Sequence, residues 1–156
     1  MKIALLGYGK MGKIIESIAL SRQHQIVLKI DKDNQHELTV ENLQQADVAI
    51  EFSTPGTVLD NINTCLEAGV PVVVGTTGWH NMLASVQQKC EDTEGTVLYG
   101  TNFSVGVNIF FHVNNSHHFS HLVGFIRTSP VKYPAAVKTY FAHIKRLHHF
   151  FKIMKG

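Results

Sequence analysis

The chain has 156 residues, which suits one domain or one domain with a fragment, and its formal net charge of +2 selects no class of partner by itself. It contains no apolar run long enough for a transmembrane helix, and the short apolar run at the start leads into glycines, so we expect neither a membrane span nor a signal peptide. Cys65 and Cys90 are too few and too far apart for a disulfide framework or a zinc site. We therefore expect two buried or half-buried thiols and a cytoplasmic location.

The charge is divided unevenly along the chain. Residues 1–111 contain 7 Lys or Arg and 12 Asp or Glu, whereas residues 112–156 contain 7 Lys or Arg, no acid, and seven of the ten histidines. The change in composition predicts two units, a first domain over 1–111 and a basic, His-rich tail of uncertain structure over 112–156.

The first unit begins with a pattern of strand, glycine turn and helix. Lys2–Leu6 is a short, mostly apolar run that predicts a buried strand, and Gly7, Gly9 and Gly12 follow it. Apolar residues then recur at three- and four-residue steps, which predicts a helix with Met11, Ile14, Ile15, Ile18 and Ala19 on one face. In this context Gly7 permits a tight turn, Gly9 allows a pyrophosphate close to the backbone, and Gly12 allows the helix to pack near the strand.

Two further features favour a dinucleotide over a turn that merely needs small residues. The N-terminus of the helix offers unpaired N–H groups to phosphates, and Lys10 adds a positive charge. Gln25–Ile30 predicts the next strand, and it ends in Asp31, which stands 19 residues after Gly12. An acid at that place is suited to accept hydrogen bonds from the adenosine ribose.

The remainder of the first unit alternates strands with helices. Thr39 is expected to cap a short helix, and Thr54 to cap a longer one with Pro55 as its first residue. The expected strands are Val48–Ile50, Val70–Val74 and Thr96–Tyr99, and the expected helices are Val40–Gln45, the one from Pro55 that stops at Gly69, and His80–Cys90. The pattern predicts an α/β fold, a Rossmann-type doubly wound sheet with at least five parallel strands.

Five loops should meet at the carboxyl edge of this sheet, where such folds bind ligands: the glycine loop, Asp31, Phe52–Thr54, Gly75–Gly78 and Asn102–Ser104. The uncharged Gly75–Gly78 loop could lie against a flat, neutral ring or be an ordinary turn. Phe103 could face a ligand or pack in the core. Within 1–111 we find no catalytic triad, carboxylate pair or metal-ligand cluster, so we assign no catalytic and no metal-binding residue.

Four motifs, in order, resemble the 4-hydroxy-tetrahydrodipicolinate reductase family, also called dihydrodipicolinate reductase. They are Gly7-Tyr8-Gly9-Lys10-Met11-Gly12, Glu51-Phe52-Ser53-Thr54-Pro55, Gly75-Thr76-Thr77-Gly78-Trp79 and the segment from Asn102 to Asn108. The resemblance covers about 1–111. It implies reduction of a cyclic dicarboxylate with NADH or NADPH in the diaminopimelate route to lysine, by enzymes that are usually cytoplasmic homotetramers.

The resemblance also implies roles for individual residues. The loop of Gly7, Tyr8, Gly9, Lys10, Met11 and Gly12 would hold the pyrophosphate, and Asp31 the adenosine ribose. Asp31 favours NADH over NADPH because it would repel a 2′-phosphate, an effect that Lys32 would partly offset. The nicotinamide would be flanked by Gly75, Thr76, Thr77, Gly100, Thr101, Asn102 and Phe103.

The tail departs from the family's pattern. After a helix from about Val105, the family continues into a substrate domain whose signature, of the type Glu-x-His-His-x-x-Lys-x-Asp-x-Pro-Ser-Gly-Thr, is missing here. His117-His118 lacks the surrounding residues, so we assign it no catalytic role. The basic charge alone does not indicate nucleic-acid binding. Two hypotheses stay open: a reductase of the lysine pathway, and a truncated or frame-shifted, non-catalytic dinucleotide-binding module.

Overall fold

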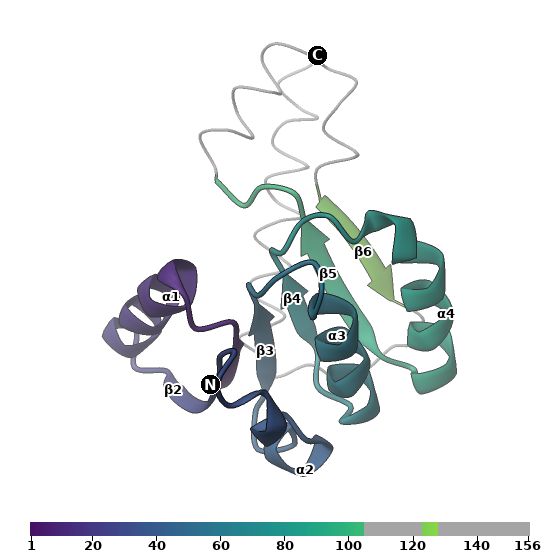
Figure 1. The fold of residues 1–156 in the computed structure, drawn as a ribbon. Helices are drawn as coiled ribbons and strands as arrows, with labels where there is room; N and C mark the ends of the chain where they lie inside the picture. The colour runs from purple at the N-terminus through teal and green to yellow at the C-terminus, as the bar shows by residue number, and fades with distance from the viewer. Residues whose placement is uncertain (105–122, 128–156) are drawn as a thin grey trace, which may run out of the picture.

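Six strands form one sheet in the computed structural model, in the order β2-β1-β3-β4-β5-β6 (Figure 1). The structure describes residues 1–104 and 123–127. The helix expected near Val105 lies outside these residues, as does the predicted tail except for 123–127. The strands are β1 (Lys2–Leu6), β2 (Gln25–Ile30), β3 (Val48–Glu51), β4 (Val72–Val74), β5 (Thr96–Gly100) and β6 (Val123–Arg127). The helices are α1 (Lys10–Ser21), α2 (Val40–Leu43), α3 (Val58–Glu67) and α4 (Leu83–Thr93), with 3-10 turns η1 (Gln35–Glu37) and η2 (His80–Met82).

The first five strands are parallel, as the alternation of strands and helices predicts. The α/β, Rossmann-type fold class is therefore confirmed. β6 comes from the predicted tail and pairs antiparallel with β5, with Gly100 opposite Val123. No strand was predicted at these positions, so part of the predicted tail extends the sheet of the first unit.

The strand order creates one topological switch point. From β1 the chain moves to β2 on one side, and it then returns to place β3 on the other side of β1. Consecutive crossovers therefore leave the carboxyl ends of β1 and β3 in opposite directions. A crevice opens at such a point in doubly wound sheets, and it is the usual place for a ligand.

The two faces of the sheet bury separate apolar clusters. Ala19 of α1 packs with Ile3, Leu5 and Val48 on one face. The larger cluster lies on the other face and joins the alternate strand residues to the apolar sides of α3 and α4, including Ala4, Leu6, Ala49, Val72, Ile62, Leu66 and Val86. Because successive strand residues point to opposite faces, these two clusters place α1 opposite α3 and α4 (Figure 1).

Two predicted helix starts had different outcomes. The Thr39 side chain accepts a hydrogen bond from the Asn42 N–H at 3.2 Å, so its capping role is confirmed. The prediction for Thr54 is wrong, because α3 begins at Val58. The carbonyl of Thr54 instead accepts from the N–H groups of Thr57 at 3.1 Å and Val58 at 3.0 Å, which makes a turn before the helix. That turn keeps Pro55 in the loop that leaves β3.

Both cysteines are buried, as expected, and no disulfide joins them. Burial raises the pKa of the Cys65 thiol to about 12, and the negative charge of Glu51 adds to this effect. Burial likewise raises the pKa of Cys90 to about 11. Among the helices of the described residues, none is long and apolar enough to cross a membrane.

Candidate functional site

The glycine loop is held by two close approaches of backbone to backbone. Gly7 has a φ of +95°, and a Cβ atom there would stand 2.2 Å from the carbonyl oxygen of Phe52. A Cβ atom on Gly12 would stand 2.4 Å from the carbonyl oxygen of Gly7. Neither space admits a side chain, so both glycines are required by the fold of the loop itself.

Gly9 differs from the other two glycines because the space beside it is open. A Cβ atom built on Gly9 would meet nothing within 4 Å. Gly9 is also the N-cap residue of α1, and no side chain caps that helix end. The first N–H groups of α1 are therefore available to an anion, and nothing on the backbone at Gly9 stands in its way.

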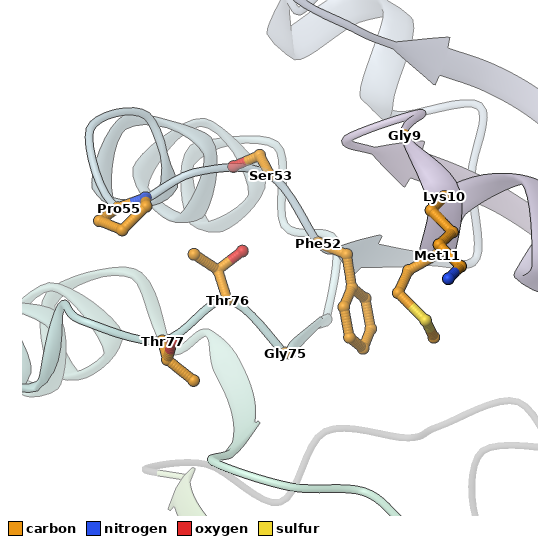
Figure 2. A pocket seen from close by; sticks show the side chains of 9 residues that line it. All are labelled: Gly9, Lys10, Met11, Phe52, Ser53, Pro55, Gly75, Thr76 and Thr77. Atoms are coloured by element: carbon orange, nitrogen blue, oxygen red, sulfur yellow. The ribbon is translucent and has the colours of Figure 1, made fainter.

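A cleft of about 430 Å³ lies at the switch point of the sheet. Three loops supply its walls: the glycine loop, the segment that leaves β3 and the segment that leaves β4 (Figure 2). The lining residues are Gly9, Lys10, Met11, Phe52, Ser53, Pro55, Gly75, Thr76 and Thr77. Lys10 supplies the positive charge, and the lining contains no Asp, Glu, His, Cys or Tyr.

The loop after β4 presents a hydroxyl group that has no partner. The Trp79 indole N–H donates to the carbonyl of Thr76 at 2.8 Å and so fixes the loop from behind. Thr76 is only 8% exposed, yet its Oγ1 is buried and makes no hydrogen bond. Its side chain points toward the segment of Phe52 and Ser53 across the cleft (Figure 2). A buried hydroxyl without a partner is uncommon and suggests that a ligand or water completes it.

Two aromatic rings occupy the space that two of the predicted site glycines leave free. The Phe52 ring lies between Met11 and Gly75, where a Cβ atom on Gly75 would stand 2.1 Å from the ring (Figure 2). A Cβ atom on Gly100 would likewise stand 3.0 Å from the Phe103 ring. The centroids of the two rings are 6.4 Å apart. Gly75 and Gly100 therefore accommodate aromatic side chains of the protein.

Asp31 lies beside the glycine loop, at the carboxyl end of β2. The Gly7 N–H donates to the carbonyl of Ile30 at 2.9 Å, which joins the two chain segments. The Asp31 side chain accepts one hydrogen bond, from the Lys32 N–H at 2.9 Å, and is exposed. Asn34 shapes the loop by accepting from the Asp31 N–H at 2.7 Å and donating to the Lys29 carbonyl at 2.9 Å.

The Tyr8 side chain takes part in a surface cluster with α1 and β2. Its hydroxyl donates to the Glu16 carboxylate, and the Lys29 ammonium lies 5.0 Å from the centre of its ring. Lys29 also pairs with Glu16 at 3.3 Å. The hydrogen bond raises the pKa of Tyr8 and lowers the pKa of Glu16. Tyr8 thus fastens the glycine loop to its neighbours and does not line the cleft.

The structure brings together some of the predicted site residues and separates others. Gly9, Lys10, Met11, Gly75, Thr76 and Thr77 line one cleft, whereas Gly7, Tyr8, Gly12, Asp31, Gly100, Thr101, Asn102 and Phe103 do not line it. The Asn102 side chain accepts from the Ser104 N–H at 2.8 Å in a local turn. Phe52 and Ser53, which were expected at this edge of the sheet but given no role, also line the cleft, as does Pro55. Their position after a strand at the switch point was the available signal.

The family model for the N-terminus of dihydrodipicolinate reductase matches residues 1–103, which include every residue of the cleft. The chain belongs to this family. It is 40% identical to 4-hydroxy-tetrahydrodipicolinate reductase of Christiangramia forsetii over 154 residues, and 33% identical to the reductase of the same name from Corynebacterium efficiens over 109 residues. The chain spans 58% and 43% of the lengths of these relatives.

The solved dihydrodipicolinate reductase of Paenisporosarcina sp. TG-14, which has dipicolinate bound, superimposes with a TM-score of 0.61. The match has 20% sequence identity and covers 76% of this chain and 53% of that one, so it supports the fold alone.

The C. forsetii alignment covers 98% of this chain and so includes most of the tail. A tail produced by a shifted reading frame would not be expected to extend such an alignment, which favours an in-frame tail. The domain boundary at Phe111 stays a prediction.

The two glycines of the loop that differ most in their surroundings give a direct test of the site geometry. We expect Gly12→Ala to lower the free energy of unfolding by about 1–3 kcal/mol, because its methyl group would overlap the carbonyl of Gly7. Gly9→Ala should cost only about 0.5 kcal/mol, the difference between these residues at an N-cap. Urea denaturation of both variants measures the difference. Equal stability of the two would contradict the packing of α1 against the loop.

Proposed function

We propose that this chain provides the cofactor-binding part of a 4-hydroxy-tetrahydrodipicolinate reductase, which uses NADH or NADPH in the diaminopimelate route to lysine. The observation that carries the proposal is the cleft at the switch point, with its uncapped helix N-terminus, its open space at Gly9 and the charge of Lys10. These are the groups that a pyrophosphate requires. The names of the relatives and the dipicolinate bound to one of them support a cyclic dicarboxylate as substrate.

The residues present fit a nicotinamide dinucleotide. The glycine loop and the first N–H groups of α1 would bind the pyrophosphate, and Asp31 the adenosine ribose. The unpartnered hydroxyl of Thr76 would meet a polar group at the nicotinamide end. When bound, the reduced cofactor supplies the hydride. The protein's part in this cleft is to orient the nicotinamide ring and exclude water. Apart from Lys10, which would meet the pyrophosphate, the lining contains no titratable side chain that could donate a proton.

The lack of a proton donor in the cleft favours the hypothesis that the chain in isolation is a dinucleotide-binding module without turnover. A proton donor and a site for the two carboxylates would then have to come from residues outside the cleft described here. A homotetramer and a cytoplasmic location follow the family's pattern and stay predictions.

Substitution at Gly9 tests the dinucleotide site. Gly9→Val should fold and yet weaken NADH binding at least about tenfold, because its side chain would fill the space that the pyrophosphate needs. A fluorescence titration with NADH measures the change. Gly56→Val is a matched control, since Gly56 lies in the exposed turn before α3 and does not line the cleft. Equal NADH affinity in Gly9→Val and the parent would refute this assignment of the glycine loop.

The choice of cofactor is tested at Asp31. The parent should accept both cofactors and prefer NADH, since a carboxylate suits the free ribose hydroxyls and repels a 2′-phosphate. Asp31→Ala should narrow the difference between the dissociation constants for NADH and NADPH. Asp33→Ala removes an equal charge from the same exposed loop and should leave that difference unchanged. A parent that prefers NADPH would count against the role of Asp31.

A turnover assay separates the two hypotheses. The purified 156-residue chain should bind NADH without oxidising it in the presence of freshly made substrate, because positioning and acid catalysis together account for many orders of magnitude in rate. Turnover that is lost in His117→Ala or His118→Ala would show that the chain carries its own catalytic site. It would then favour the complete reductase activity.

A further inference from the structure

A buried carboxylate lies directly behind the cleft. Glu51 is the last residue of β3 and has no exposed surface. Its Oε1 accepts from the Ser53 N–H at 3.1 Å, from the Ser53 hydroxyl and from Asn61 Nδ2 at 3.3 Å. Its Oε2 has no partner, and within 1–104 no Lys, Arg or His forms an ion pair with it. These neutral donors are what holds the carboxylate in the core.

The hydrogen bonds continue from Glu51 to a second loop of the site. Asn61 of α3 is fully buried and donates from Nδ2 to Glu51 and, at 3.2 Å, to the Ser53 hydroxyl. Its Oδ1 accepts from Gln35 Nε2 at 2.9 Å. The amide of Asn61 has only one satisfactory orientation, because reversal would direct its oxygen at the carboxylate of Glu51. The four side chains of Gln35, Asn61, Glu51 and Ser53 thus form one directed chain of hydrogen bonds.

The two ends of this chain lie in different parts of the proposed cofactor site. Gln35 begins η1, in the connection that follows Asp31, and so belongs to the adenosine end. Ser53 lines the cleft between the glycine loop and the loop after β4. The buried residues Asn61 and Glu51 join these ends beneath the surface of the site. A change in the position of one end should therefore be transmitted to the other through these hydrogen bonds.

We propose that Glu51 is a positioning residue whose buried chain of hydrogen bonds couples the adenosine loop at Gln35 to the cleft wall at Ser53. The proposal rests on the dinucleotide-binding function proposed above. A structural role alone would be served as well by an apolar side chain on β3, since burying a carboxylate without a paired cation is costly. Glu51 acts through Ser53 and does not itself touch the cofactor.

The hydrogen-bond donors around Glu51 converge on one of its oxygens. The N–H and the hydroxyl of Ser53 and the Nδ2 of Asn61 all face Oε1. Movement of either donor would therefore disturb the other.

The first experiment needs no ligand. Gln35→Met keeps the volume of this half-buried side chain and removes the hydrogen bond to Asn61. If the chain of hydrogen bonds transmits this loss to the cleft wall, the hydrogen bond from the Ser53 N–H to Glu51 should weaken. The Ser53 amide proton should then exchange with solvent faster than in the parent. Gln88→Met removes an exposed amide that bonds only to Asp92 on α4, and it should leave Ser53 unchanged. An unchanged exchange rate at Ser53 in Gln35→Met would overturn the proposal.

The second experiment measures the coupling in the bound state. NADH dissociation constants are compared for the parent, Gln35→Met, Ser53→Ala and the double variant. Each single variant raises the NADH dissociation constant by some factor. If the two positions are coupled, the factor for the double variant should be smaller than the product of the two single factors by about fivefold or more. A factor for the double variant equal to the product of the single factors would mean that the two positions act independently, and it would overturn the coupling. If the parent binds no NADH, the proposed function fails, and the exchange rate of Ser53 still decides the coupling.

Discussion

The site depends on the absence of a side chain at Gly7. This residue has a φ of +95° and places its Cα so close to the end of β3 that a Cβ atom would stand 2.2 Å from the Phe52 carbonyl oxygen. The Phe52 N–H in turn donates to the Leu6 carbonyl at 2.7 Å, so β1 and β3 remain paired to their last residues. Immediately beyond this contact the chain turns toward α1 on one side and α3 on the other. The position of the cleft follows from that divergence.

Much of the fold was predictable because its signals are local. The five parallel strands are apolar runs that end in glycine or polar residues, and the capping by Thr39 needs only residues within one turn. The start of α3 was not predictable in this way, because a Thr-Pro pair suits a helix start and a turn equally well. β6 could not be predicted because an edge strand is defined by its partner, here β5, and the two strands are too far apart along the chain for a short hairpin turn to fix the pairing.

The candidate site was predictable to the extent that glycines and strand ends mark it. The sequence identified the glycine loop and the segment Gly75–Thr77, which the structure brings into one cleft. It could not show that the space at Gly75 is taken up by the Phe52 ring, or that Glu51 is fully buried. Both facts arise from contacts between neighbouring strand ends and α3, which are close in space and distant along the chain. For the same reason Phe52 and Ser53 were expected at this edge but not assigned to the cofactor site, and Pro55 was expected in a helix.

The polar groups around the cleft are divided between two functions. The N–H and the hydroxyl of Ser53 both donate to Glu51, so they are not available to bind a phosphate group. An anion in the cleft must therefore depend on the N-terminus of α1 and on Lys10, while the wall at Ser53 supplies shape. A carboxylate within the cleft would repel a pyrophosphate. With its carboxylate outside the cleft lining, between Ser53 and Asn61, Glu51 fixes that wall while the lining itself carries no negative charge.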